Sequence, residues 1–140
     1  MTLYHFEVNP ITSDVIAAAI EVHRVLGPGL LESVYLTCLL YELRQRGFKI
    51  ETQEPQPIVY KGMKLDCGYR LDLVVNDSVI VEVKSVDRLA PIHQAQMITY
   101  LRLTGLHVGL LLNFNVPVMR EGIKRVLNNA TAVDPSDNQR

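Results

Sequence analysis

The sequence predicts an α/β fold in which helices flank a central mixed sheet of four or five strands. Residues 70–85 alternate apolar and charged side chains around Asn76 and Asp77, which predicts a β-hairpin at the centre of the sheet. Residues 107–114 form a nearly continuous apolar run, which is typical of a strand buried on both faces. Because a helical segment from Pro91 to Gly105 connects these strands, we expect a right-handed parallel crossover between them.

The composition indicates one folded domain. The chain has 140 residues, 48% of them apolar and 21% charged, which is enough for a single hydrophobic core. We expect this domain over residues 1–128, followed by a polar, disordered tail over residues 129–140. No apolar run approaches the roughly 20 residues that cross a bilayer, and the N-terminus lacks the pattern of a signal peptide.

Cysteine content and charge indicate the environment and limit the partners. Cys38 and Cys67 have no metal-type spacing and do not suggest a disulfide framework, so we expect a cytoplasmic protein with free thiols. The net charge of -1 and the pI near 6.4 argue against a general nucleic-acid coat protein, which would be basic. They do not exclude a nuclease, because a bound cation restores the charge that an acidic metal site subtracts.

Three further helices are expected around the strands. After an extended lead-in over residues 1–11, Thr12 or Ser13 caps a helix that ends near residue 26. A second helix covers about residues 30–46, and a closing helix covers residues 118–127. The predicted core positions are Val15, Ala18, Ala19, Val22 and Leu26 in the first helix, and Leu31, Val34, Cys38, Leu39 and Leu43 in the second.

The segment before the hairpin predicts extended structure. Residues 48–60 read as one or two strands, interrupted by Pro55 and Pro57 as at a sheet edge or bulge. Lys61-Gly62 predicts a turn, and Gly68 predicts a bend in the arm that leads into the hairpin.

The register of the hairpin follows from burying one of its faces, because a slip of one residue turns every side chain over. A two-residue loop would set Asp72 against Val81 and mix the two faces. A three-residue loop, residues 76–78, keeps the faces separate. It pairs Leu71 with Val83, Leu73 with Val81, Val75 with Val79, Asp72 with Glu82, and Arg70 with Lys84.

The charged face of the hairpin would hold two opposed carboxylates. Directly opposed Cβ atoms lie about 4.5–5.5 Å apart, so Asp72 and Glu82 repel unless something compensates. A divalent cation would compensate, and Lys84 beside Glu82 on the same face would help. The alternative is that the pair belongs to an ordinary solvent-exposed polar face.

Two helices carry further candidate residues. Glu32 lies in the first turn of the second helix, where it either stabilises the helix dipole or delivers an acid to the hairpin. His93, Gln96 and Tyr100 form a polar stripe on the third helix, which is either a solvated face or part of the site. A lone histidine such as His93 is more often structural than catalytic. The apolar set beside the stripe comprises Ile92, Met97, Ile98 and Leu101.

These residues resemble the motifs of a known superfamily. Asp72-x9-Glu82-x-Lys84 is similar to the core signature of the PD-(D/E)XK nucleases, with Leu71 where a proline often stands. Gly29-x-x-Glu32-x-x-Tyr35 resembles the motif of the GxxExxY proteins, a small-domain branch of that superfamily. The resemblance covers about residues 12–127. It extends through Tyr60, Asp72, Glu82-Val83-Lys84, His93, Gln96, Tyr100 and Asn113-Phe114-Asn115.

The resemblance implies a restriction-endonuclease-like core and metal-dependent hydrolysis of phosphodiester bonds in nucleic acid, with DNA as the expected substrate. The cofactor would be Mg²⁺ or Mn²⁺, and a homodimer is compatible with the sequence. The implied catalytic residues are Glu32, Asp72, Glu82, Lys84, Gln96 and Tyr100, and the implied metal ligands are Glu32, Asp72, Glu82 and the carbonyl of Val83.

The resemblance also assigns roles. Lys84 would hold the attacking water, and Gln96 would orient the nucleophile or a phosphate oxygen. Tyr100 would contact the nucleic-acid backbone, because Gln-x-x-x-Tyr resembles an extra motif of recombination-type exonucleases in the superfamily. Arg70, Arg88 and Arg102 are candidate phosphate contacts without a motif.

Two alternatives to a nuclease remain open. The chain is then either a catalytically silent nuclease-fold module that binds nucleic acid or protein, or a metabolic or effector protein that acts on a small phosphorylated ligand.

Overall fold

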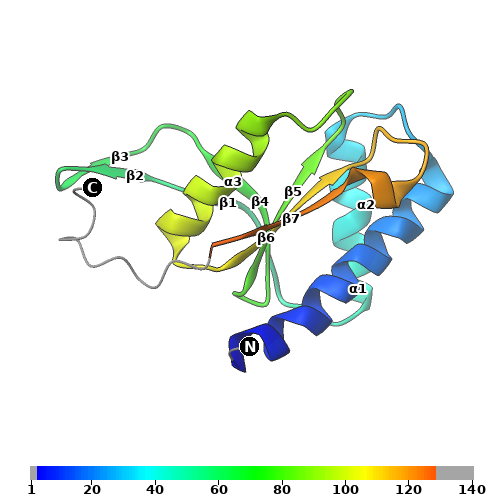
Figure 1. Cartoon of the computed structure of the whole chain (residues 1–140), viewed down its shortest axis with the longest axis horizontal. Coiled ribbons are helices and arrows are strands. Elements are labelled where there is room, and N and C mark those ends of the chain that lie inside the picture. Colours follow the sequence, from blue (N-terminus) through cyan, green and yellow to red (C-terminus); the bar gives the residue numbers. More distant parts are fainter. Residues whose placement is uncertain (1–2, 129–140) are drawn as a thin grey trace.

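A five-stranded mixed sheet forms the centre of the molecule in the computed structural model, which describes residues 3–128 (Figure 1). The strand order is β1-β4-β5-β6-β7, and only β5 and β6 are parallel. The strands are β1 Ile50–Pro55, β4 Arg70–Val75, β5 Val79–Lys84, β6 Val108–Asn113 and β7 Ile123–Leu127. The predicted mixed sheet with a central hairpin is therefore confirmed.

Helices cover both faces of this sheet. The helices are α1 Leu3–Leu26, α2 Glu32–Gln45 and α3 Pro91–Thr104. Helices α1 and α2 pack on one face, and α3 packs on the other, as Figure 1 shows. The third helix and the buried strand after it are confirmed, as is the parallel pairing that their order implies.

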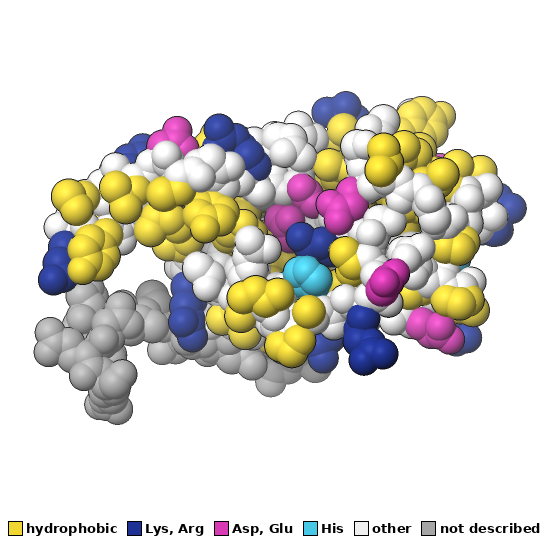
Figure 2. All heavy atoms as spheres, turned by 90° about the horizontal axis from the view of Figure 1, so that it is seen from above, with side chains coloured by type: hydrophobic (Ala, Val, Ile, Leu, Met, Phe, Trp, Pro, Cys, Tyr) yellow, Lys and Arg dark blue, Asp and Glu magenta, His cyan; other side chains and the backbone are white. Residues whose placement is uncertain are grey.

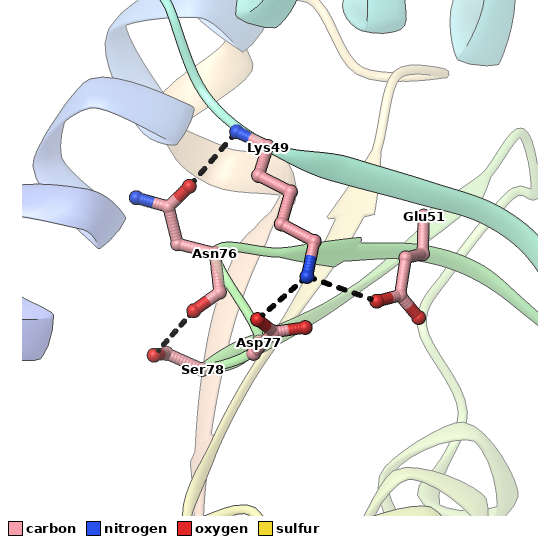
Figure 3. A network of polar contacts seen from close by, with 5 residues as sticks. All are labelled: Lys49, Glu51, Asn76, Asp77 and Ser78. Atoms are coloured by element: carbon pink, nitrogen blue, oxygen red, sulfur yellow. Dashed lines mark hydrogen bonds and ion pairs between the residues drawn. The ribbon is translucent and has the colours of Figure 1, made fainter.

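The hairpin has the predicted register. Leu73 pairs with Val81 and Val75 with Val79, across a turn in which Asn76 and Asp77 adopt φ of 50° and 54°. Asparagine and aspartate tolerate this left-handed conformation better than other side chains. Figure 3 shows how the turn is fixed to the start of β1: the Lys49 N–H donates to Asn76 Oδ1 at 2.9 Å, and Lys49 Nζ lies 2.9 Å from Asp77 Oδ2.

Two buried clusters form the core, one on each face of the sheet. The cluster facing α1 and α2 confirms the predicted core residues of α1 and Leu39 and Leu43 of α2, with Leu26 and Cys38 partly buried at its margin. The cluster facing α3 comprises Leu71, Val74, Ile80, Met97, Tyr100, Leu101, Leu111 and Val126.

One hairpin residue packs on the unexpected face. Leu71 was predicted to share a face with Leu73, but it belongs to the cluster beneath α3. The β4–β5 pairing runs only from Val75–Val79 to Leu73–Val81. Beyond that point side-chain carboxylates, rather than β5, accept backbone N–H groups, so β5 no longer constrains the alternation at Leu71, which pairs only with Glu54 of β1.

The start of α1 differs from the prediction. The helix begins at Leu3 and includes Pro10, so residues 3–11 are not an extended lead-in. Thr12 is not a cap: its hydroxyl donates to the carbonyl of Asn9 at 3.0 Å, as threonine does inside a helix. Arg125 of β7 donates to both Asn9 Oδ1 and Thr12 Oγ1, so this part of α1 is attached to the last strand.

The predicted closing helix over residues 118–127 is wrong. A short 3₁₀ helix, η1 Met119–Gly122, leads into β7, which pairs antiparallel with β6. Pairing satisfies the backbone groups along the edge of β6, and this tertiary requirement outweighs the local helical spacing. Gly122 is needed at the junction, because a Cβ there would clash with the carbonyl oxygen of Asn113.

Two predicted core residues, Leu31 and Val34, lie at the surface. Ile92, from the apolar set of the third helix, is also exposed. Leu31 precedes the first residue of α2 and has an extended backbone, and the face of α2 that meets the sheet is the one that carries Tyr35, Leu39 and Leu43. Ile92 lies in the first turn of α3, where the helix extends past the core.

The segment before the hairpin forms two strands and an arm. β1 joins the edge of the sheet, whereas β2 Ile58–Tyr60 and β3 Met63–Leu65 pair only with each other. We call residues 56–70, which contain β2 and β3, the β2–β3 arm; it extends away from the helices (Figure 1). The predicted turn at Lys61-Gly62 and the bend at Gly68 are present, with φ of 48°, 81° and 78°. The tail over residues 129–140 lies outside the described residues.

Gly29 and Tyr35 fix the connection between α1 and α2. Gly29 has φ of 96°, a conformation that side chains with a Cβ rarely adopt. The Tyr35 hydroxyl donates to the carbonyl of Gly27 at 2.5 Å and accepts the N–H of Leu30 at 3.1 Å. The Tyr35 ring stacks on Phe114 with centroids 4.6 Å apart. The connection is thereby held against the end of β6, close to the candidate site.

We expect Tyr35→Phe to lower the free energy of unfolding by about 1–3 kcal/mol, because it leaves the Gly27 carbonyl and the Leu30 N–H without their partner. Urea denaturation measures this loss. The matched control is Tyr41→Phe in the same helix, where the side chain is 62% exposed; it should change stability by less than about 0.5 kcal/mol. Equal effects of the two substitutions would contradict the role of the Tyr35 hydroxyl.

Candidate functional site

Asp72 of β4 and Glu82 of β5 lie side by side on the sheet face that α3 covers. The N–H of Asp72 donates to Glu82 Oε1 at 3.1 Å, and the N–H of Val83 donates to Asp72 Oδ2 at 2.8 Å. Each carboxylate therefore accepts a backbone N–H from the other strand. This reciprocal arrangement follows from the three-residue loop, which places the two residues opposite each other.

Burial makes the carboxylic acid form of Glu82 unusually stable. The residue is only 6% exposed, and its pKa is raised from the ordinary value of 4.5 to about 8. Loss of hydration is the largest cause, and the nearby Asp72 charge is the second. The N–H bond from Asp72 and the charge of Lys84 act in the opposite direction but do not cancel the shift. Ionisation of Glu82 therefore costs free energy in the folded protein, and a bound cation would offset this cost.

Tyr100 of α3 lies above this pair. It is 5% exposed, and burial raises its pKa, with further contributions from the charges of Glu82, Tyr69 and Asp72. Its hydroxyl therefore keeps its proton and can donate a hydrogen bond. Tyr69, at the base of the β2–β3 arm, makes an edge contact with the Tyr100 ring, with centroids 6.4 Å apart.

Glu32 lies at the end of β5 and not within the pair. As the first residue of α2, it accepts the N–H of Ser85 at 3.2 Å through Oε1, while the Ser85 hydroxyl donates to the carbonyl of Leu30 at 2.7 Å. Within residues 3–128 no three acidic, histidine or cysteine side chains are grouped closely enough to hold an ion together. The structure thus brings Asp72 and Glu82 together, whereas Glu32 contacts Ser85, the residue that follows Lys84.

Lys84 lies at the margin of the pair, and Gln96 lies on α3, the helix that covers this face. Lys84, the last residue of β5, is half-buried, and its charge favours the ionised form of Glu82. Gln96 is half-buried one turn before Tyr100. Among the described residues no hydrogen bond joins Gln96 to Asp72, Glu82 or Lys84. Of the polar stripe on α3, Tyr100 is therefore the member in electrostatic contact with the carboxylates.

His93 caps a helix. Its ring Nδ1 accepts the backbone N–H of Ala90 at 3.0 Å, and the backbone N–H of His93 donates to the Ala90 carbonyl at 2.9 Å. Because Nδ1 accepts a hydrogen bond here, the neutral ring carries its proton on Nε2. This contact fixes the start of α3 and agrees with the structural interpretation of His93.

Asn113, at the end of β6, holds the loop that follows Lys84. It is buried, its Oδ1 accepts the N–H groups of Val86 and Asn115, and its Nδ2 donates to the Val86 carbonyl at 2.9 Å. Sequence reasoning gave no role to Asn113 beyond the motif resemblance, and it did not single out Ser85 or Tyr69. A polar residue that ends a fully apolar run was the available signal for Asn113.

Among the described residues, none of the three candidate arginines forms a hydrogen bond or ion pair with Asp72 or Glu82. Arg70 begins β4 and forms an exposed ion pair with Asp66 at 3.9 Å, and Arg102 is exposed in the last turn of α3. Arg88 and Lys124 line a cavity of about 420 Å³ between the loop after β5 and β7. Neither Asp72 nor Glu82 lines this cavity.

The surface around the site combines both charges. Figure 2 shows acidic side chains in the middle of one face, with a basic side chain and a histidine next to them. The β2–β3 arm lies to the left of this group and helices α1 and α2 to the right. Among the described residues, no helix has the length and apolar character that a bilayer crossing requires.

Comparison with known proteins identifies the fold family. The family model of the PD-(D/E)XK nuclease superfamily matches residues 9–126, which is most of the chain. This match agrees with a five-stranded mixed sheet flanked by three helices. No curated protein and no solved structure matches the chain.

The raised pKa of Glu82 predicts a pH dependence of stability in the metal-free protein. The folded state holds the proton more tightly than the unfolded state, so stability is greatest below about pH 4.5 and falls as the pH rises towards about 8. We expect this residue to contribute a loss of roughly 2–4 kcal/mol across that range. Urea denaturation in EDTA at several pH values measures it.

Glu82→Gln tests the assignment, because it removes the titrating group and keeps the size of the side chain. We expect the pH dependence between about 4.5 and 8 to flatten in this variant. The exposed Glu121→Gln is the control and should keep the wild-type slope. An unchanged slope in Glu82→Gln would contradict the assignment.

Proposed function

The chain belongs to the PD-(D/E)XK nuclease superfamily, and on this basis we propose that it is a metal-dependent nuclease that hydrolyses phosphodiester bonds of nucleic acid, with DNA as the expected substrate. The observation that carries the proposal is the buried Glu82 beside Asp72 on one hairpin, with Lys84 following on the same strand. A raised pKa gives no advantage to an acid pair whose role is only structural. A cation site requires carboxylates held close together, and this closeness raises the pKa when the cation is absent.

The donor set fits Mg²⁺ or Mn²⁺. Asp72 and Glu82 would bind the ion with their carboxylate oxygens, the Val83 carbonyl would be a further ligand, and Glu32 would reach the site from the start of α2. Carboxylates are the usual protein ligands of Mg²⁺, which keeps several waters and a substrate phosphate in its shell. Once bound, such an ion polarises the phosphate and lowers the pKa of a coordinated water.

The residues of the chain itself have separate tasks in this proposal. Lys84 supplies a positive charge beside Glu82, where it holds the attacking water and offsets charge that develops on the phosphate. The protonated Tyr100 donates a hydrogen bond to a phosphate oxygen. Gln96, one turn away, orients the nucleophile or the phosphate. His93 holds the start of α3 and takes no part in the chemistry.

One observation favours a second function. Both carboxylates already accept backbone N–H groups, so Asp72 and Glu82 also stabilise the hairpin. A catalytically silent module that binds nucleic acid or protein would retain them for that reason. An assay of cleavage separates the two functions, and it also separates a nuclease from a protein that acts on a small phosphorylated ligand.

The direct test is cleavage of labelled DNA and RNA oligonucleotides in Mg²⁺, in Mn²⁺ and in EDTA. We expect cleavage only with a divalent ion, and we expect Lys84→Ala to reduce the rate by about 100-fold or more, because it removes charge stabilisation from the transition state. Lys124→Ala, an exposed lysine outside the hairpin, is the matched control and should leave the rate unchanged. Equal rates in the two variants would contradict the role of Lys84.

Asp72→Asn should separate stability from activity. The amide oxygen still accepts the Val83 N–H, while the charge that opposes ionisation of Glu82 is removed. We therefore expect an unchanged or higher melting temperature in EDTA, together with loss of cleavage. Asp77→Asn in the turn is the control and should retain cleavage, since Asp77 contacts Lys49 and not the site. A melting temperature many degrees lower, with activity intact, would make Asp72 a structural residue.

A further inference from the structure

The β2–β3 arm exposes apolar side chains that no other element within residues 3–128 covers. Its two strands pair only with each other, and a two-stranded ribbon gains little stability by itself. Tyr60 and Met63 face each other across the ribbon and are 55% and 56% exposed. Leu65 lies on the same face, and Val59 is exposed on the other. A group of exposed apolar side chains of this kind marks a surface that contacts a binding partner.

The arm is also the positively charged part of an otherwise acidic chain. Residues 56–70 contain Lys61, Lys64 and Arg70 against Asp66, a net charge of +2, so the rest of the chain carries -3 to give the total of -1. This sum already includes Asp66, whose ion pair with Arg70 is long, at 3.9 Å, and exposed. A polyanion is therefore attracted to the arm and repelled by the remaining surface.

The arm leads to the carboxylates. The N–H of Gln56 donates to the Tyr69 carbonyl in the same register as β1 and β4, so the arm continues the strand pair that carries Asp72. Tyr69 is 43% exposed and contacts Tyr100, whose pKa is raised in part by Glu82 and Asp72. Figure 2 shows hydrophobic side chains in a row from the arm to the acidic side chains in the middle of the face.

We propose that the β2–β3 arm binds single-stranded nucleic acid and leads it into the Asp72–Glu82 site, an inference that rests on the proposed nuclease function. Tyr60 and Tyr69 stack on exposed bases, while Lys61 and Arg70 contact phosphates. Lys64 pairs with Val59 on the opposite face of the ribbon and adds only to the positive potential of the arm. In Tyr60 one ring face is near Lys61 Nζ, 5.5 Å from the centroid, so a base stacks on the opposite face. A duplex fits less well, because its base faces are covered and exposed tyrosine, methionine and leucine do not read its polar base edges.

The test is fluorescence anisotropy of the full chain with a labelled single-stranded oligonucleotide and its duplex, in EDTA so that nothing is cleaved. We expect the single strand to bind more tightly than the duplex. Tyr60→Ala and Tyr69→Ala should each weaken binding to the single strand by about tenfold. The matched control is Tyr41→Ala, an equally exposed tyrosine on α2 outside the arm, which should leave binding unchanged.

The substitution Lys61→Ala tests the phosphate contacts. The slope of log K against log salt concentration should become less steep by about 0.7, since each phosphate contact on a single strand contributes about that much. Melting temperatures near the wild-type value are expected for these arm variants, because the substituted residues lie outside the five-stranded sheet. If Tyr60→Ala unfolds the protein, the salt slope of the lysine variant decides the question.

Three results would overturn the inference: no binding of single strands, equal binding of the two forms, or unchanged binding by the arm variants. It would also be overturned if light scattering found a dimer that the arm variants dissociate, since the arm would then join two copies. Failure of the nuclease proposal looks different: arm-dependent binding in EDTA persists, but no cleavage occurs in Mg²⁺ or Mn²⁺.

Discussion

The centre of the structure depends on one interaction: Asp72 and Glu82 each accept a backbone N–H group from the other strand of the central hairpin. It replaces the strand ladder at the point where β4 and β5 separate, and it places a carboxyl group in a nearly dry environment. The cost appears as the raised pKa of Glu82. Burying an acid in this way is unfavourable for stability alone, and it becomes useful if a cation binds there.

The surrounding elements hold this pair in place from both sides. On one side α3 brings Tyr100 over the carboxylates, and His93 fixes the start of that helix. On the other, Tyr35 and Gly29 fix the connection that precedes α2, so that Glu32 meets Ser85 directly after Lys84. The Gly-x-x-Glu-x-x-Tyr motif therefore has two structural members, Gly29 and Tyr35, and one acid at the margin of the site.

The sequence was sufficient to predict the parts of the fold that depend on alternation and burial. The hairpin register followed because only one loop length separates apolar from charged faces, and the buried strand β6 followed from an uninterrupted apolar run. The last strand was predicted as a helix because Met119, Ile123 and Val126 are spaced by four and three residues, whereas in the structure Ile123 and Val126 pack on opposite faces of the sheet. Only the open edge of β6, which exists in three dimensions, decides in favour of a strand.

The site was predictable in part for the same reason. Register alone brings Asp72 and Glu82 together, but no local pattern shows that Glu32 bonds to Ser85 or that His93 caps a helix. These contacts depend on where loops end, which hydrophobic periodicity does not determine. The separate arm was missed because its strands have three residues each, too few for a periodic signal. Tyr60 was assigned to the extended segment 48–60 and to the resemblance, and Tyr69 was not singled out.

The central claim is that Asp72 and Glu82 form a cation site, and a crystal soaked in Mn²⁺ tests it most directly through the anomalous signal of the metal. The account predicts an anomalous peak about 2.0–2.2 Å from one oxygen of each carboxylate, with water completing the shell. It also predicts that the peak disappears in crystals of Asp72→Asn. A Mn²⁺ ion bound elsewhere on the chain, with the two carboxylates still holding only their backbone N–H groups, would contradict the account.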